Sequence, residues 1–327
     1  MFDICAMGEI LIDAIAQADS SVHITANAGG APANVLACAS GLGLNTTFIA
    51  KAGDDYIGKW LKSVLDNTGI HTEGMILDPK RNTTIAMVSL DETGNRSFAF
   101  YRNGCADVNM TKEEVRLDVI EQSKAFHFGS VSLTEEPSRT ATLFAAEYAA
   151  NRGLLVSYDP NLRKNLWSGE EEARHYIKEG LRLCHVAKLA DEECTFLYGE
   201  GDLKTIGKQM LKDYPNLKLL FVTCGADGAY AFAGDQDVYV PGFEVKAVDT
   251  TGAGDSFVGA ALYQIISEKM DLAGLTAEKL RAMVTFCNAV GALVVQKHGA
   301  IPAMPTMEAV KEFLTTEKEI VRVIYKN

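Results

Sequence analysis

The chain has 327 residues, of which 47% are hydrophobic and 23% are charged, and its formal net charge is −12. This composition is typical of globular proteins and excludes a disordered or fibrous chain. The negative charge disfavours nucleic acid and anionic membranes as partners. No apolar run reaches the roughly 18 residues that a membrane span requires.

Seven cysteines are scattered along the sequence, without a C-x-x-C pair or a Cys/His cluster with zinc spacing. Their odd number and wide separation predict reduced thiols, as in a cytoplasmic protein. The first sixteen residues contain three acids and no basic stretch, so they do not resemble a secretion signal. We therefore expect a cytoplasmic location.

Short apolar strands alternate with amphipathic helices along most of the chain. The expected strands are residues 2–7, 46–50, 125–129, 154–158, 185–189 and 217–222. The expected helices lie near 32–42, 55–68, 136–151, 170–183 and 202–213, and then at about 255–268, 276–295 and 306–316. This alternation predicts a three-layer α/β/α sandwich with a mostly parallel central sheet. With no visible linker or repeat, residues 1–327 are expected to form a single domain.

Two segments depart from this alternation. Residues 11–24 and 83–101 have the pattern of paired strands, and the second contains the turn-rich sequence DETGNR at 91–96. We expect parts of 10–27 and 82–104 to form a small β-sheet beside the main sheet. Ligands collect at the carboxyl ends of parallel strands, so such a sheet would act as a lid. Residues 320–325 fit either an edge strand or the end of a helix.

The most informative segment is DTTGAGDSF, from Asp249 to Phe257, which follows an apolar strand pattern and opens an apolar-faced helix. Gly252 and Gly254 leave room for close approach of a ligand to the backbone. The first amides of a helix have no partner within the helix, so they can bind an anion such as a phosphate. We therefore expect the amides of Ala253, Gly254 and Asp255 to stabilise a transferred phosphoryl group.

Asp255 lies in the first turn of that helix, beside the expected phosphate. A carboxylate there would repel the phosphate, unless it serves to orient and deprotonate an attacking hydroxyl. An aspartate that only caps the helix is the alternative, and it would be preferred for an isolated G-x-G-D. Here all nine residues from Asp249 to Phe257 match a specific sequence signature, and they lie between an expected strand and an expected helix. This match favours the catalytic role.

DTTGAGDSF resembles the C-terminal signature of the PfkB family of carbohydrate kinases, which have the ribokinase-like fold. AGGAPANVLACASGLG at 28–43 resembles the glycine-rich N-terminal signature of the same family. Segments between the two signatures match in order, so the resemblance covers essentially the whole chain. GGAPAN, FYRN, FHFGS and SYDPNLR are most similar to the fructokinases of the family.

The resemblance implies a sugar site, a nucleotide site and bound cations. The sugar is expected to contact Asp13, Gly29, Gly30, Asn34 and Arg102. Arg163 is expected to neutralise charge on the transferred phosphate. The expected ATP-binding residues are Asn161, Lys188, Thr223, Gly225, Gly228 and Asn288. Glu193 is expected to hold Mg²⁺ through water, although Ala190 replaces the asparagine of the family segment, and Asp249, Thr251 and Gly299 match positions that hold K⁺.

The resemblance therefore implies an ATP-dependent kinase that transfers the γ-phosphoryl group to a hydroxyl of fructose. Relatives acting on ribose, 2-keto-3-deoxygluconate or a nucleoside remain alternatives, as does a non-catalytic sensor of sugar or nucleotide on the same scaffold. A nicotinamide oxidoreductase is disfavoured, because no G-x-G-x-x-G fingerprint is complete. A P-loop at GDDYIGK, residues 53–59, is rejected because Trp60 cannot ligate Mg²⁺. Homodimers formed through the lid are expected from relatives.

Overall fold

The protein is described by a computed structural model that covers residues 1–18, 22–90 and 96–324. Its main sheet has nine strands in the order β13-β12-β11-β10-β9-β8-β1-β4-β5. These strands are β1 (Phe2–Met7), β4 (Thr46–Gly53), β5 (Ile70–Asp78), β8 (Ser123–Gly129), β9 (Leu155–Asp159), β10 (Val186–Ala190), β11 (Leu219–Thr223), β12 (Gly228–Ala233) and β13 (Gln236–Pro241). Pairing is parallel from β5 through β11 and antiparallel at β12 and β13.

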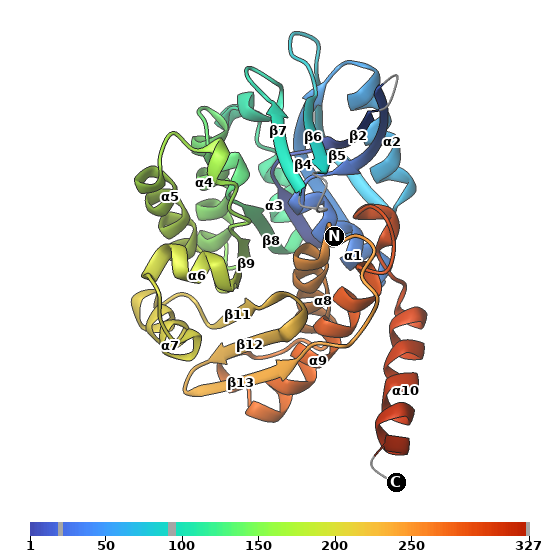
Figure 1. Cartoon of the computed structure of the whole chain (residues 1–327). Coiled ribbons are helices and arrows are strands. Elements are labelled where there is room, and N and C mark those ends of the chain that lie inside the picture. The colour runs from blue at the N-terminus through green and yellow to red at the C-terminus, as the bar shows by residue number, and fades with distance from the viewer. Residues whose placement is uncertain (19–21, 91–95, 325–327) are drawn as a thin grey trace.

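Helices cover both faces of this sheet (Figure 1). The helices on one face are α3 (Leu117–Glu121), α4 (Ser138–Asn151), α5 (Glu170–Leu183), α6 (Asp191–Tyr198) and α7 (Leu203–Asp213). Those on the other face are α1 (Ala31–Gly41), α2 (Tyr56–Asn67), α8 (Ala253–Ser267) and α9 (Ala277–Val294). Helix α10 (Met307–Ile324) follows and packs on α9. The predicted three-layer sandwich is thus confirmed, and residues 320–324 continue a helix.

The strands read as continuous apolar runs because both of their faces are buried. Along β1, the side chains of Cys5 and Met7 enter the core under α4 and α5, while those of Ile4 and Ala6 enter the core under α1. Successive side chains of a strand point to opposite faces, which explains this division. The layered packing fixes the carboxyl ends of β1, β9, β10 and β11 along one edge of the sheet.

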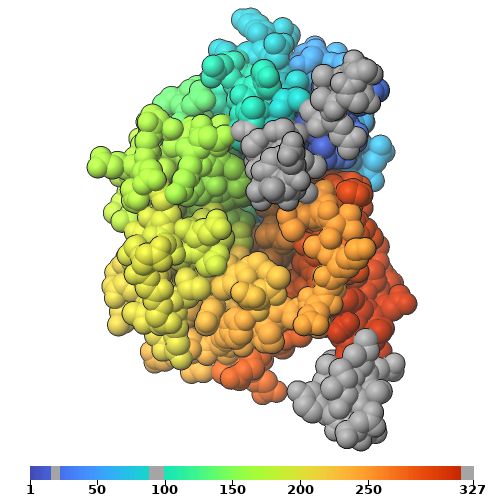
Figure 2. All heavy atoms as spheres, in the orientation of Figure 1, coloured from blue at the N-terminus to red at the C-terminus, as the bar shows by residue number. Residues whose placement is uncertain are grey.

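A second sheet stands beside the first and has four strands in the order β3-β2-β6-β7. It consists of β2 (Leu11–Ala18), β3 (Val22–Gly29), β6 (Thr84–Leu90) and β7 (Arg96–Tyr101). This small sheet confirms the predicted paired strands, whereas the turn at 91–95 lies outside the described residues. Figure 2 shows the small sheet in blue and cyan, next to a hollow between the yellow-green and orange parts of the surface.

Within the described part of the chain, no helix combines the length and the apolar character needed to span a membrane.

Candidate active site

The glycine-rich turn before α8 has the conformation that the sequence predicts. Gly252 has φ 81° and forms the N-cap of α8, and an added Cβ there would lie 2.8 Å from the Ala300 Cβ. The first helical bond runs from the Ser256 N–H to the Gly252 carbonyl, at 2.8 Å. In the described structure the amides of Gly254 and Asp255 have no protein acceptor, so both can bind an anion.

Ala253 differs from this expectation. Its N–H donates to the Thr250 carbonyl at 3.3 Å, because the turn closes on itself one residue before the helix begins. The prediction of three open amides is therefore corrected to two, those of Gly254 and Asp255. The bond from the Ala253 N–H to Thr250 is long for an N–H···O contact, so it holds the Ala253 amide weakly.

Asp255 is buried, with 7% of its surface exposed, at the start of α8. Its Oδ2 accepts a hydrogen bond from the Asn34 Nδ2 at 2.8 Å, and its Oδ1 accepts one from the Asn161 Nδ2 at 3.3 Å. Burial raises the pKa of Asp255 to about 6, and the negative charge of Asp159 adds to this effect. The Asn34 hydrogen bond and the cations of Lys188 and Arg163 oppose the rise in pKa. A carboxylate tuned in this way suits a general base near neutral pH.

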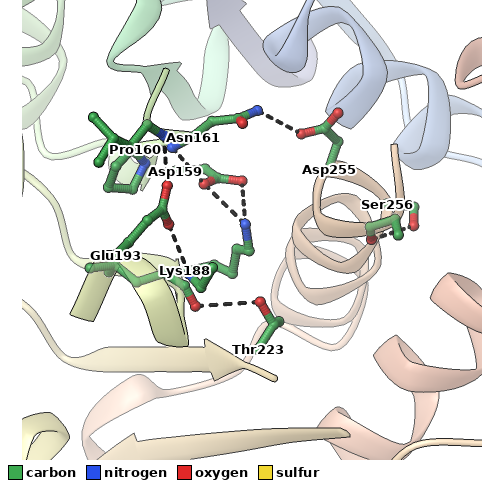
Figure 3. Close-up of polar contacts among 12 residues, drawn as sticks. Asp159, Pro160, Asn161, Lys188, Glu193, Thr223, Asp255 and Ser256 are labelled. Atoms are coloured by element: carbon green, nitrogen blue, oxygen red, sulfur yellow. Dashed lines mark hydrogen bonds and ion pairs between the residues drawn. The ribbon is translucent and has the colours of Figure 1, made fainter. Parts of the chain in front are cut away.

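Lys188 brings a buried positive charge to the same place. Its Nζ lies 3.1 Å from the Asp159 Oδ2 and 3.2 Å from Oδ1. Burial lowers the pKa of Lys188, but the nearby carboxylates of Asp159, Glu193 and Asp255 outweigh burial, so the net pKa is raised and the ammonium is kept charged. An added Cβ on Gly254 would lie 2.9 Å from that Nζ, so the ammonium borders the open amides. Figure 3 shows Lys188 bonded to Asp159, with Asp255 nearby at the start of α8.

Two cavities meet at this turn, since Thr250 and Gly254 line both. The smaller has a volume of about 300 Å³ and is enclosed by the small sheet, α1, the loop after β9 and the α8 turn. The larger has a volume of about 650 Å³ and is bordered by the loop between β11 and β12, residues 242–247 and α9. Ligands that occupy the two cavities would therefore meet at Gly254, where a group can pass from one ligand to the other.

The smaller cavity brings together most of the residues expected at the sugar and the transferred phosphate. Its walls include Asp13, Gly30, Asn34, Asn161, Arg163, Lys188, Gly252, Gly254 and Asp255. Gly29 lies behind Asp13, because an added Cβ on Gly29 would be 2.4 Å from the Asp13 Oδ2. The N- and C-terminal signatures, more than 200 residues apart in sequence, therefore face the same space.

Arg102 does not itself line this cavity. It is buried, its Nε donates to the Asp107 Oδ2 at 2.7 Å, and its Nη1 donates to the Thr134 Oγ1 at 2.7 Å. Its Nη2 donates to the carbonyl of Val131, at 3.1 Å, and Val131 does line the cavity. These bonds join the end of β7 to the main domain. The direct sugar contact of Arg102 stays a prediction, and the bonds formed here are structural ones.

The larger cavity holds four of the six residues expected at the nucleotide, whereas the other two, Asn161 and Lys188, line the smaller cavity. The four that line the larger cavity are Thr223, Gly225, Gly228 and Asn288. The Asn288 Nδ2 donates to the carbonyls of Val240 and Pro241, at 3.2 and 3.1 Å, which ties α9 to the end of β13. Four separate segments of the chain form this cavity. It is lined mainly by apolar and backbone groups, as ligand pockets usually are.

Glu193 has two backbone partners. Its Oε1 accepts from the Leu162 N–H at 2.6 Å, and its Oε2 accepts from the Ala190 N–H at 2.8 Å. The carboxylate therefore clamps the loop after β9 to the start of α6, and it lines neither cavity. A contact with Mg²⁺ through water stays a prediction. Among the described residues no cluster of three His, Cys, Asp or Glu side chains has a metal-binding arrangement.

The three residues expected at a monovalent cation lie together. The Asp249 Oδ1 accepts from the Thr251 N–H at 2.8 Å, and its Oδ2 accepts from the Gly299 N–H at 3.1 Å. The Asp249 carboxylate thus joins the loop before α8 to the loop after α9. The binding of a monovalent cation between these two loops stays a prediction.

Sequence reasoning missed several residues of the site. Glu9, Phe100 and Val131 line the smaller cavity, and residues 243–247 line the larger one. Glu9 carried a usable signal, because it is a charged residue two positions after a buried strand of a parallel sheet. Val131 and residues 243–247 carry no chemical signal, since only the fold brings them to the cavities.

Comparison with known proteins gives consistent matches along the chain. Residues 1–307 match the model of the family described as pfkB family carbohydrate kinase. The chain is 41% identical over 324 residues to a probable fructokinase-2 of Arabidopsis thaliana, covering 97% of both chains. It is similar to the crystal structure of a fructokinase from Xylella fastidiosa with bound ATP, with a TM-score of 0.90, 32% identity and coverage of 97% and 99% of the two chains.

A further similar structure is a fructokinase double mutant from Vibrio cholerae O395 in a form with bound fructose, ADP and potassium ion. Its TM-score is 0.85 and its identity is 30%, and the match covers 96% of this chain and 98% of the other. These matches, the ribokinase-like sandwich and the two signatures facing one site agree with one another. The chain belongs to the pfkB family of carbohydrate kinases.

Proposed function

We propose that this protein is an ATP-dependent fructokinase, with fructose in the smaller cavity and ATP in the larger one. The observation that carries the proposal is the junction of the two cavities at Gly254, directly beside the buried carboxylate of Asp255. The chain is 41% identical to a probable fructokinase over nearly its whole length, and this similarity supports fructose as the sugar.

In the proposed reaction, the carboxylate of Asp255 accepts the proton of a sugar hydroxyl as the hydroxyl oxygen bonds to the γ-phosphorus. The bond from that phosphorus to the β,γ-bridging oxygen breaks, and ADP leaves. The Gly254 and Asp255 amides, with Lys188 and Arg163, stabilise charge on the transferred group. Asn34 and Asn161 orient the base through its two oxygens.

Metal ions would complete the charge balance. Mg²⁺ would enter with the nucleotide phosphates and neutralise their charge, as is usual where the protein offers no cage of its own. A K⁺ ion at the loops joined by Asp249 would add positive charge near the turn. The potassium-bound fructokinase from Vibrio cholerae supports this assignment.

We also propose that the chain acts as one kinase domain, with the small sheet closing over the sugar as a lid. Phe100 of β7 and Asp13 of β2 line the sugar cavity, which supports this role. Homodimers through the lid are proposed as well, because Ile24 and Tyr101 are exposed apolar side chains on its edge strands. A cytoplasmic location is proposed from the seven free thiols.

The test of the proposed function is a coupled assay of ADP release with ATP and a panel of sugars. The panel contains fructose, ribose, 2-keto-3-deoxygluconate and a nucleoside. The proposal predicts the highest kcat/KM with fructose. A higher kcat/KM with another acceptor would assign a different substrate, and binding of sugar without any ADP release would favour a non-catalytic sensor.

A further inference from the structure

A second buried carboxylate, besides Asp255, lines the smaller cavity. Glu9 follows β1 at the carboxyl edge of the sheet, and only 3% of its surface is exposed. The proposed reaction gives it no role. A carboxylate held out of water is costly unless its oxygens find hydrogen-bond partners, so the bonds of each oxygen decide what Glu9 does.

One oxygen of Glu9 has a structural partner. Its Oε1 accepts from the Ala31 N–H at 2.8 Å, in the first turn of α1. The N-cap residue of α1 is Gly30, which has no side chain to cap the helix, so Glu9 satisfies one of the orphan amides instead. An added Cβ on Gly30 would lie 2.4 Å from the Glu9 carbonyl oxygen, so this turn is packed directly on the Glu9 backbone.

The other oxygen has no partner among the described residues. The Glu9 Oε2 is buried and unbonded, and so is the Oδ1 of Asn34, one turn further along α1. Other buried polar atoms without partners belong to Thr46, Ser132, Thr142, Tyr158 and Trp167, none of which lines either cavity. The two residues that carry these unsatisfied acceptors, Glu9 and Asn34, both line the smaller cavity. A buried acceptor without a donor destabilises the structure, so a ligand that supplies the donor gains affinity.

A polyhydroxy ligand can satisfy both acceptors, because each hydroxyl donates one hydrogen bond. We propose that Glu9 is a specificity-determining residue of the sugar site, whose Oε2 accepts a hydrogen bond from a hydroxyl that is not phosphorylated. This inference rests on the proposed function, since it takes the smaller cavity to be the sugar site. Because Oε1 is anchored to Ala31, the position of Oε2 is fixed before the sugar enters, which favours recognition.

Glu9 fulfils this role in its ionised form, which predominates at pH values above its pKa. Burial raises its pKa to about 7, its backbone hydrogen bonds and the cation of Arg102 lower the pKa, and the carboxylate of Asp107 raises it. An ionised acceptor forms a stronger hydrogen bond with a hydroxyl than a neutral one does. A sugar that lacks the matching hydroxyl would leave the acceptor unpaired, and sites of this kind reject such analogues strongly.

The experiment compares wild type with Glu9→Gln on fructose and on its mono-deoxy analogues. Gln keeps an oxygen for the Ala31 N–H and puts an amide NH₂ in place of Oε2. We expect the KM for fructose to rise by about tenfold or more, with the KM for ATP changed less than about twofold. The deoxy analogue that lacks the hydroxyl bound by Glu9 should be a poor substrate of wild type. Its kcat/KM should be the same for wild type and for Glu9→Gln, because neither enzyme can form that hydrogen bond with it.

Two further variants separate recognition from structure. Asp202→Asn removes another helix-capping carboxylate, the N-cap of α7, which lines neither cavity, and it should leave both KM values unchanged. Glu9→Asp withdraws the acceptor by one methylene and replaces the Gln variant if the latter fails to fold. The same rise in KM for fructose is expected from Glu9→Asp.

The possible outcomes distinguish this inference from the proposed function. Unchanged discrimination among the deoxy analogues, in a variant that still phosphorylates fructose, overturns the role of Glu9 alone. Equal rises in the KM for fructose and for ATP, with a lower Tm, would make Glu9 a structural residue and also overturn it. Absence of phosphorylation of every sugar by wild type would overturn the proposed function itself.

Discussion

The Nδ2 of Asn34 donates a hydrogen bond to the Oδ2 of Asp255 at 2.8 Å, although 221 residues separate them in sequence. This bond joins the glycine-rich segment before α1 to the first turn of α8. It leaves the Oδ1 of Asn34 without a hydrogen-bond donor, and Asn34 lines the smaller cavity, where the sugar is proposed to bind. A single amide therefore links sugar recognition to the orientation of the proposed base.

The pH dependence of activity should follow Asp255. The carboxylate accepts a proton only when it is ionised, and its pKa is raised to about 6 by burial and by Asp159. The kcat/KM for fructose is therefore expected to fall about tenfold per pH unit below pH 6. A pH–rate profile at saturating ATP measures this, and a profile that stays flat down to pH 4.5 would exclude Asp255 as the titrating group.

Removing charges near Asp255 should shift the acidic limb of the pH–rate profile, the fall in kcat/KM at low pH, in a direction set by the sign of the charge removed. Asp159→Asn removes a negative charge that raises the pKa of Asp255, so the limb should move to lower pH. Lys188→Met removes a cation that lowers the same pKa, so the limb should move to higher pH and turnover should fall. Shifts in the same direction for both variants would contradict this electrostatic arrangement.

Asp255→Asn should stabilise the folded protein at neutral pH. The folded-state pKa of about 6 lies above the ordinary value of 3.8, so ionising Asp255 costs stability as the pH rises between these two values. Asn avoids that cost, and the gain should be on the order of 1–3 kcal/mol at pH 8 and vanish near pH 4. Urea unfolding at both pH values checks this, and an equal difference at both would contradict it.

Gly254→Ala should impair phosphoryl transfer more than folding. The added methyl group would lie 2.9 Å from the Lys188 Nζ and would intrude between that ammonium and the open amides. Turnover should drop by roughly ten- to a hundredfold. Gly169→Ala is the matched control, because its Cβ meets nothing within 4 Å at the start of α5. Equal turnover in the two variants would count against a close approach of phosphate at Gly254.

A monovalent cation should activate the enzyme through the loops that Asp249 joins. Replacing potassium chloride with choline chloride at constant ionic strength should lower kcat, and Asp249→Ala should abolish the difference, because the loops before α8 and after α9 lose their link. The readout is ADP release in the two salts. A variant that still responds fully to potassium would remove the cation site from these loops.

The sequence predicted the layered fold because each buried strand and amphipathic helix carries its own periodic pattern. It also predicted the turn at Gly252 and the position of the Asp255 carboxylate beside it, since a helix N-terminus and a glycine-rich loop have local chemical signatures. The role of Asp255 as base stays a prediction. Strands β12 and β13 were not predicted, because their antiparallel hairpin lacks the strand–helix rhythm of the rest. Helix α6 was missed as an element for a similar reason, being only eight residues long.

The remaining site features depend on contacts between distant segments. The structural bonds of Arg102 to Asp107 and Thr134, and those of Glu193 to two backbone amides, arise only after folding. The Ala253 bond to Thr250 depends on how tightly the turn closes, which residue types do not specify. Glu9 has an unpaired oxygen because of the packing around it, so sequence alone could mark its position but not its role.

The most direct test of the account is the turnover of Asp255→Asn with fructose and ATP, combined with calorimetric measurement of fructose binding. The variant keeps the shape of the side chain but cannot accept the hydroxyl proton. We expect kcat to fall by roughly 10²–10⁴-fold while the Kd for fructose stays within about threefold of wild type. A kcat near that of wild type would show that Asp255 is not the base, and the proposed mechanism would have to be abandoned.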